Sequence, residues 1–314
     1  MAALAIDGDN VAYDLSARDA AAANATNKVL VWNAATGKTT KVSGKKTASA
    51  DTSSTGAGVF QLAIAGSRVA WLLNEGGNTE GDDYLFASSL TTPKERKVAS
   101  ATRFGDGCPG RSGSSCAGQW LGGLVGSGKL IAANRWTTGS NGSVTAGELD
   151  VLSGTKLKRI ATGANTVEAS VADAGRIGVL RADGSVALYS AAGKLLFSVS
   201  PSGAEAVALR GQNLLVGTKT QQLQLYNART GALRRTFSTR STKQPRNVDV
   251  QGNIAIYTTG SAGVLHALNL SSGRDSVIAE RHGGVLLAHI DSAGLVYAGN
   301  GSGTNSVSAM RRRV

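Results

Sequence analysis

Apolar and polar residues alternate along most of the chain in short runs, and turns that contain glycine separate one run from the next. Alternation with a period of two is the pattern of a β-strand that has one buried and one exposed face. One run–turn–run phrase, LQLYNARTGALRRTF at Leu223–Phe237, has a near copy, VLVWNAATGKTTKV, at Val29–Val42. The glycine of each copy can adopt the positive φ that a short hairpin turn needs, so each copy predicts a β-hairpin.

This hairpin phrase recurs through the chain, and a second phrase precedes it. Further copies of the hairpin phrase lie at Val186–Val199 and Val264–Ile278, with looser copies at Tyr84–Val98 and Glu148–Ile160. In the second phrase two apolar strands flank a tight glycine turn, and its seven copies are centred near Gly8, Gly66, Gly126, Gly175, Gly211, Gly252 and Gly294. One repeat is therefore four antiparallel strands, which cannot bury their faces alone and must stack against neighbouring repeats.

These repeats predict an all-β fold, a seven-bladed β-propeller of four-stranded antiparallel blades in a single domain that spans residues 1–314. A β-helix would need a shorter period, and a β-sandwich would not repeat in this way. The predicted blades lie at about 1–44, 59–99, 118–162, 166–200, 204–240, 246–280 and 284–314. The last blade has room for three strands, so we expect its missing outer strand to belong to chain upstream of Met1.

Two of the hairpin phrases carry a family resemblance. NAATGK at Asn33–Lys38 and NARTGA at Asn227–Ala232 resemble the PQQ-like, or quinoprotein-type, repeat, which is related to WD40-like propeller repeats. The resemblance covers the whole chain loosely, and what it implies is the propeller architecture. That family has a docking Trp a few residues after the Gly-Lys, but here Thr40, Lys41 and Val42 follow Lys38, and the WD40 Gly-His and Trp-Asp signatures are absent. We therefore expect no bound quinone and no other cofactor.

Five long segments interrupt the repeats of the first three blades. They are Ser16–Lys28, Gly44–Gly58, Asn74–Asp83, Ser100–Gly118 and Thr137–Gly147. If strands A to D run from the inside of a blade outwards, each segment is a B–C or D–A loop, and all five open on one face. Loops on a rigid scaffold often carry binding sites, although surface loops also simply tolerate insertions.

The predicted binding residues on this face are aromatic and charged, because such side chains dominate interfaces. They are Glu75, Asp82, Arg103, Phe104, Asp106 and Trp136. We expect Phe104 and Trp136 to be at least partly exposed, whereas Trp32 and Trp71 lie within predicted strands and should be buried. Trp120 begins an inner strand and fits either environment.

Cys108 and Cys116, the two cysteines of the chain, lie in the Ser100–Gly118 segment. The residues between them are flexible enough to allow disulfide geometry, and the sequence nearby has no His to complete a zinc site. A disulfide predicts an oxidising compartment, so we expect a secreted or bacterial periplasmic or cell-envelope protein, although two free thiols in a cytosolic protein remain the alternative. The chain shows neither a signal peptide nor an apolar stretch long enough to span a membrane.

The charge of the chain does not indicate nucleic-acid binding. Lys and Arg number 33 against 21 Asp and Glu, which gives a formal net charge of +12, but the basic residues are scattered. Aromatic residues make up 5 % of the chain, too few for a platform on which bases stack. We expect a monomer that binds a protein or glycan ligand and no nucleic acid.

Catalytic motifs are missing from the sequence, which has no Gly-x-Ser-x-Gly, no His-Glu-x-x-His and no phosphate-binding loop. Glu168, Glu205 and Arg246 lie near the starts of inner strands of blades 4, 5 and 6, where they can surround the mouth of a central channel. The leading hypothesis is a non-catalytic binding or scaffold propeller, and the alternative is a carbohydrate-active lyase or hydrolase with carboxylates at the channel mouth. The acidic segment Asn74–Asp83 suits either Ca²⁺ or plain solvation, and we expect solvation and no metal.

Overall fold

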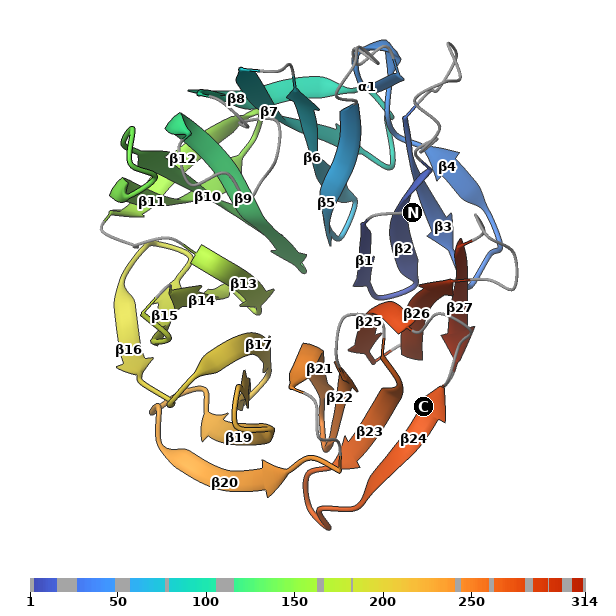
Figure 1. Cartoon of the computed structure of the whole chain (residues 1–314). Coiled ribbons are helices and arrows are strands. Elements are labelled where there is room, and N and C mark those ends of the chain that lie inside the picture. The colour runs from blue at the N-terminus through green and yellow to red at the C-terminus, as the bar shows by residue number, and fades with distance from the viewer. Residues whose placement is uncertain are drawn as a thin grey trace. The chain divides into compact units, whose positions relative to one another are not determined.

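The computed structural model describes residues 3–15, 27–48, 57–76, 79–105, 116–162, 167–181, 183–240, 244–259, 263–279, 285–292, 294–300 and 307–312. The chain forms two compact units, Met1–Val167 and Glu168–Val314, which we call unit 1 and unit 2. The described segments contain one helix, α1 (Lys45–Ala48), of 4 residues. No helix in these segments is long and apolar enough to cross a membrane. Strands make up nearly all of the regular structure (Figure 1).

Unit 1 contains two antiparallel sheets. The first has the order β1-β2-β3-β4, and the second runs from β5 to β12 with every strand next to its sequence neighbour. The strands are β1 (Leu4–Asp7), β2 (Asn10–Leu15), β3 (Lys28–Asn33), β4 (Thr39–Lys41), β5 (Ala57–Ala65), β6 (Arg68–Gly76), β7 (Glu80–Ser89), β8 (Arg96–Phe104), β9 (Ala117–Ser127), β10 (Leu130–Thr138), β11 (Val144–Ser153) and β12 (Lys156–Thr162). The first strands of successive meanders, β1, β5 and β9, lie side by side (Figure 1).

Unit 2 contains three four-stranded sheets and one three-stranded sheet, each an antiparallel meander in chain order. The strands are β13 (Val167–Asp173), β14 (Arg176–Arg181), β15 (Val186–Ser190), β16 (Leu195–Val199), β17 (Ala204–Arg210), β18 (Asn213–Thr218), β19 (Gln222–Asn227), β20 (Leu233–Ser238), β21 (Pro245–Gln251), β22 (Ile254–Thr259), β23 (Leu265–Asn269), β24 (Asp275–Ala279), β25 (Val285–Asp291), β26 (Gly294–Asn300) and β27 (Val307–Arg312). In the described part of the chain the last sheet, β25-β26-β27, thus has the three strands that the sequence predicted.

Apolar side chains that alternate along the strands pack between neighbouring meanders. In unit 1, Val31, Trp71 and Phe86 belong to one buried cluster, and the rings of Trp71 and Phe86 stack with centroids 5.8 Å apart. In unit 2, Leu215 and Tyr257 belong to a corresponding cluster. The prediction that Trp71 is buried is confirmed. The same prediction for Trp32 is wrong because its side chain is only half-buried on β3, the third of the four strands in its sheet.

The eight-stranded sheet of unit 1 is two four-stranded meanders joined by one extra strand pair. β8 and β9 pair through Arg103 opposite Gly118 and Phe104 opposite Ala117. A side chain at Gly118 would not fit, because a Cβ atom there would lie 2.5 Å from the carbonyl oxygen of Thr102, and the backbone of Gly118 has a φ of +138°. Glycine at this position therefore permits the two meanders to merge.

Two of the predicted long loops, Asn74–Asp83 and Thr137–Gly147, are largely strand, so that part of the prediction is wrong, whereas residues 106–115 of Ser100–Gly118 lie outside the described residues. In Asn74–Asp83, β6 continues to Gly76 and β7 starts at Glu80. In Thr137–Gly147 and Ser100–Gly118, the flanking strands likewise run into the segment, which gives β6 to β11 lengths of 9–11 residues. Two charged residues, Asp83 and Arg103, occupy buried positions in these extensions, which hides the alternation of the strands. Most of Ser16–Lys28 and of Gly44–Gly58 lies outside the described residues.

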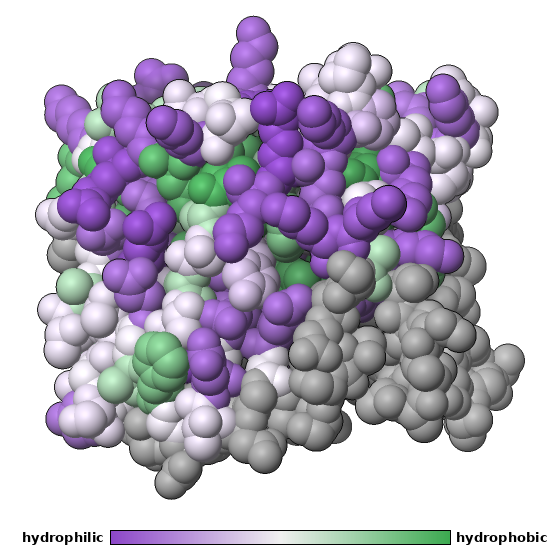
Figure 2. Space-filling view, turned by 90° about the horizontal axis from the view of Figure 1, so that it is seen from above, coloured by the Kyte–Doolittle hydropathy of each residue, from purple (hydrophilic) through white to green (hydrophobic). Residues whose placement is uncertain are grey.

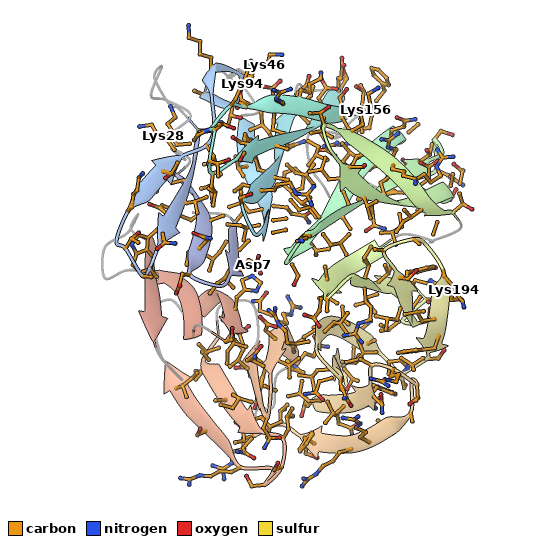
Figure 3. The ribbon with its side chains drawn as sticks, turned by 180° about the vertical axis from the view of Figure 1, so that it is seen from behind. Asp7, Lys28, Lys46, Lys94, Lys156 and Lys194 are labelled. Atoms are coloured by element: carbon orange, nitrogen blue, oxygen red, sulfur yellow. The ribbon has the colours of Figure 1, made fainter. Side chains whose placement is uncertain are left out.

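Side chains next to the tight turns connect one meander to the next. In unit 1, Asp7 accepts hydrogen bonds from the backbone N–H groups of Gly66 (2.6 Å) and Gly128 (3.4 Å), and Figure 3 shows Asp7 at the inner edge of the unit. In unit 2, Asp173 accepts a hydrogen bond from the N–H of Gly211 at 2.6 Å. The third turn was expected near Gly126, but the residue with positive φ is Gly128, because Gly126 lies within β9.

Candidate binding site at one end of the β5–β12 sheet

Five of the residues that the sequence predicted for binding lie at one end of the eight-stranded sheet. Glu75 ends β6, Asp82 lies near the start of β7, Arg103 and Phe104 end β8, and Trp136 lies near the end of β10. Because neighbouring strands are antiparallel, these positions all fall at the same end of the sheet. The sixth predicted residue, Asp106, lies outside the described residues. We call Asp83, Arg103, Phe104, Trp120 and Trp136 the sheet-end cluster.

Arg103 does not lie on the surface, which corrects the expectation that it is an exposed anchor. Its side chain is fully buried, and its Nη1 atom lies 3.0 Å from Oδ2 of the equally buried Asp83. Asp83 also accepts hydrogen bonds from Nδ2 of Asn74 (3.0 Å) and from the backbone N–H of Leu121 (3.3 Å). A buried charge needs such partners to offset its lost hydration, so the pair ties β7, β8 and β9 together inside the sheet end.

Two tryptophans extend this arrangement. The guanidinium of Arg103 lies 4.1 Å from the ring centroid of Trp120, and the ring of Trp120 stacks on that of Trp136 with centroids 6.0 Å apart and planes 4° from parallel. Nε1 of Trp120 donates a hydrogen bond to Oγ1 of Thr138 at 2.9 Å. Gly122 leaves room for the second ring, because a Cβ atom there would lie 2.8 Å from Trp136. The stack is therefore held from several sides.

Phe104 projects from this fixed base into solvent. Its side chain is 58 % exposed, although it lies within a hydrogen-bonded strand and pairs with Glu80 of β7 and Ala117 of β9. Trp136 is half-buried. The expectation that both rings are at least partly exposed is confirmed, whereas their role in binding stays a prediction. Trp120, which fitted either environment, is buried at 6 % exposed.

Acidic side chains lie beside Phe104. Glu75 and Asp82 are directly opposite each other on β6 and β7, which places two like charges side by side. Asp82 accepts hydrogen bonds from Oγ1 of Thr102 (2.5 Å) and from the hydroxyl of Tyr84 (3.2 Å). Burial and, after it, the nearby carboxylates of Asp82 and Glu75 together raise the pKa of Tyr84 to about 12. This acidic group of Glu75, Glu80 and Asp82 contrasts with the positive net charge of the chain.

Cys116 belongs to the same region. It packs against Trp120 and Trp136, is 1 % exposed and is not a free thiol. Its predicted partner Cys108 lies outside the described residues, so the pairing stays a prediction. Within the residues that the structure covers, no three His, Cys, Asp or Glu side chains are grouped closely enough to hold a metal ion. Two residues of the acidic segment, Gly77 and Asn78, are not covered, so Ca²⁺ binding by that segment is untested.

The three residues predicted for a channel mouth lie on the first strands of three successive sheets of unit 2. Glu205 on β17 is mostly buried, and its Oε1 lies 3.8 Å from Nζ of Lys219. Arg246 on β21 is exposed, and Glu168 lies on β13, where its side chain is outside the described residues. The structure thus describes one of the two carboxylates, and the lyase or hydrolase alternative stays a prediction.

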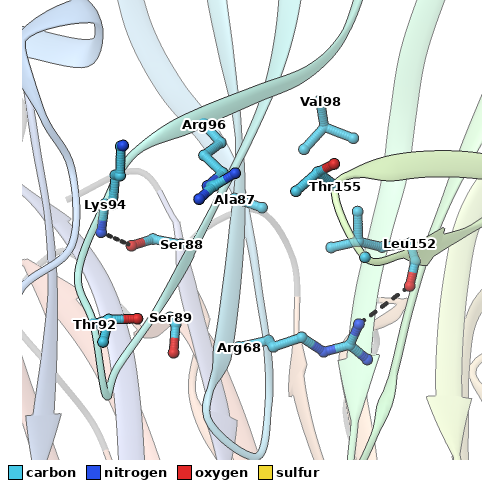
Figure 4. Close-up of a pocket in the computed structure, with 11 residues that line it drawn as sticks. Arg68, Ala87, Ser88, Ser89, Thr92, Lys94, Arg96, Val98, Leu152 and Thr155 are labelled. Atoms are coloured by element: carbon cyan, nitrogen blue, oxygen red, sulfur yellow. Dashed lines mark hydrogen bonds between the residues drawn. The ribbon is translucent and has the colours of Figure 1, made fainter.

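A cavity at the opposite end of the β7–β12 strands was not anticipated from the sequence. It has a volume of about 380 Å³ and lies between the β7–β8 and β11–β12 turns (Figure 4). Figure 2 shows hydrophilic residues across the upper part of one side of the molecule, with apolar areas between them. The phrase PKERKV at Pro93–Val98 places three basic residues close together, but nothing in the sequence indicates that Arg68 and Leu152 lie beside them.

No protein-family model and no curated protein sequence matches the chain. Solved structures do resemble it. A chain of the mitotic checkpoint complex is 17 % identical with a TM-score of 0.63, covering 100 % of this chain and 87 % of that one. The β-propeller domain of the Trilobed protease from Pyrococcus furiosus is 12 % identical with a TM-score of 0.59, covering 98 % and 91 %. The WD40 β-propeller domain of Doa1 is 12 % identical with a TM-score of 0.57, covering 94 % and 88 %.

These likenesses show the fold. The chain has a β-propeller fold, similar to those of WD40 and other propellers, as the sequence repeats predicted.

Proposed function

We propose that this chain is a non-catalytic binding propeller that holds a protein partner at the sheet-end cluster. The observation that carries the proposal is Phe104, a large apolar side chain 58 % exposed on a strand that is paired on both sides. Aromatic side chains on rigid supports are preferred anchors of protein interfaces, because little conformational entropy is lost when they are buried. The WD40 propellers among similar folds, which are commonly protein-binding scaffolds, support the same proposal.

The chemistry around Phe104 indicates the kind of partner. Glu80 pairs with Phe104 across the β7–β8 ladder, Asp82 follows on the same strand, and Glu75 lies opposite Asp82 on β6. A partner that inserts beside Phe104 therefore meets carboxylates at the edge of the contact. We infer that the partner presents an apolar pocket bordered by Lys or Arg, since complementary charges favour association and fix its register. The proposed compartment is the secreted space or the cell envelope, and the predicted Cys108–Cys116 disulfide supports it.

The experiment compares Phe104→Ala with a matched control. Leu233→Ala removes an apolar side chain that is 54 % exposed on β20, so both variants lose similar exposed apolar surface. Native extracts are passed over each immobilised protein, and proteins retained by the wild type are then titrated as purified samples. We expect a partner whose dissociation constant rises at least tenfold with Phe104→Ala and is unchanged with Leu233→Ala.

Two results would overturn the proposal. One is a purified partner that binds both variants as tightly as the wild type, which would place its interface elsewhere. The other comes from a glycan-binding screen run in parallel. If glycans bind in a Phe104-dependent way and no protein does, the site is a glycan site and the protein-partner proposal fails.

A further inference from the structure

The cavity between the β7–β8 and β11–β12 turns lies far along the strands from the sheet-end cluster and plays no part in the proposed function. Its volume of about 380 Å³ is in the range that small-molecule sites occupy. The residues that line it are Arg68, Ala87, Ser88, Ser89, Thr92, Lys94, Arg96, Val98, Leu152, Gly154 and Thr155. Three of them are cations, four carry hydroxyl groups, and none is a carboxylate.

The alternation of one strand segment explains this one-sided charge. Lys94, Arg96 and Val98 face the cavity. Glu95 points to the other side, where it accepts hydrogen bonds from the backbone N–H groups of Gly44 (3.0 Å) and Lys46 (2.9 Å). Lys97 also faces away, with its Nζ 4.6 Å from the ring centroid of Tyr84. The sequence therefore places its acid outside the cavity and two of its bases inside.

Arg68 is held in place before any ligand arrives. Its Nη1 donates a hydrogen bond to the carbonyl oxygen of Leu152 at 3.2 Å, and its Nη2 donates one to the carbonyl oxygen of Lys129. Figure 4 shows Arg68 reaching toward the carbonyl oxygen of Leu152 on one side of the cavity, with Arg96 and Lys94 on the other side. A guanidinium that is already oriented by backbone carbonyls loses less freedom when it binds an anion.

We propose that this cavity binds a small molecule that carries a phosphate or sulfate ester. The guanidinium fork of Arg96 matches the oxygen geometry of these groups, Arg68 adds a fixed positive charge, and the hydroxyls of Ser88 and Thr155 supply further donors. A phosphate or sulfate group brings negative charge into a cavity whose charged lining residues are all cations. Ala87, Val98 and Leu152 form an apolar wall that suits the carbon skeleton of the ligand.

The test uses defined probes. Titration calorimetry and thermal unfolding are run with glucose 6-phosphate, glucose 6-sulfate, inorganic phosphate and glucose. We expect the two esters to bind and to raise the melting temperature, and glucose to do neither. Tighter binding of the esters than of inorganic phosphate shows that the cavity also contacts the sugar skeleton. Equal binding of inorganic phosphate and the esters overturns the ester as the ligand.

A pair of variants on the same strand gives the matched control. Arg96→Gln removes a cation that faces the cavity, and Lys97→Gln removes a neighbouring cation that faces away, so the net charge changes equally. Both side chains are exposed, and unliganded melting temperatures check that both proteins fold. We expect Arg96→Gln to weaken ester binding at least tenfold and Lys97→Gln to leave it within twofold. Equal weakening by both variants, or no binding of any charged probe, overturns the proposal.

Discussion

The sheet-end cluster contains one buried ion pair, formed by Asp83 and Arg103. Both side chains are fully buried and lie 3.0 Å apart, with a tryptophan ring against the guanidinium. Such a pair contributes little net stability compared with an apolar replacement of both residues, but the loss of one partner leaves an uncompensated charge. The pair holds together the strands that carry Phe104.

We therefore expect Arg103→Met to lower the free energy of unfolding by about 3–5 kcal/mol, measured by urea denaturation. The control is Arg159→Met, which removes the exposed partner of the Arg159–Glu148 pair (2.5 Å) and should cost less than about 1 kcal/mol. Similar losses for the two variants would show that the Asp83–Arg103 pair is solvated in solution.

A second prediction concerns the pH dependence of stability. The pKa of Tyr84 is about 12 in the folded protein, above its usual value near 10, chiefly because of burial and then because of Asp82. A raised pKa means that the folded state holds the proton more tightly, so the stabilising contribution is complete below pH 10 and is lost as the pH rises toward 12. The difference in tyrosinate absorbance between wild type and Tyr84→Phe should report this late titration.

Asp82→Asn separates the two causes of that shift. Removing the carboxylate should lower the pKa of Tyr84, but the value should stay above 10 because burial is the larger cause. A pKa near 10 for Tyr84 in the wild type would contradict the description of its surroundings on β6 and β7.

At the scale of elements, sequence patterns predicted where the hairpins lie but not how long some of their strands are. The glycine turns at Gly8, Gly66 and Gly175 all have positive φ, because a tight turn leaves few other choices for the residue. The lengthened strands β6 and β7 were missed, because Asp83 occupies an inward position that would normally be apolar. Its partner Arg103 lies on another strand, so the pairing that allows this burial is not visible locally in the sequence.

The β8–β9 junction gives the prediction that belongs to this scale. Gly118→Ala places a Cβ atom against the carbonyl of Thr102 and requires a strained φ, so we expect a loss of about 1–3 kcal/mol in stability. Amide hydrogen exchange near Phe104 should rise with it. Gly58→Ala is the control, since a Cβ atom at Gly58 would meet nothing within 4 Å, and it should change stability by less than about 1 kcal/mol. Protection of the β8 amides that survives in Gly118→Ala would show that the junction does not depend on this glycine.

At the scale of the whole molecule, the all-β repeat architecture was accessible from sequence because each repeat encodes the same strand and turn chemistry. The sites were accessible only in part. The position of Glu75, Asp82 and Phe104 at one sheet end follows from the antiparallel order, and the sequence predicted that grouping. The burial of Arg103 and the cavity at Arg68 and Arg96 depend on contacts between strands far apart in the chain, and no local pattern encodes them.

The compartment of the molecule gives the last prediction. Cys116 is buried beside Trp120 and Trp136 and is not a free thiol, and the chain contains one other cysteine, Cys108. Titration of the native, unreduced protein for free thiols should therefore find none. Replacing both cysteines by Ala should lower the free energy of unfolding by about 2–3 kcal/mol at most, because the bond closes a short loop. Two reactive thiols in the native protein would contradict the bond and favour a reducing compartment, since disulfides persist in secreted and envelope proteins.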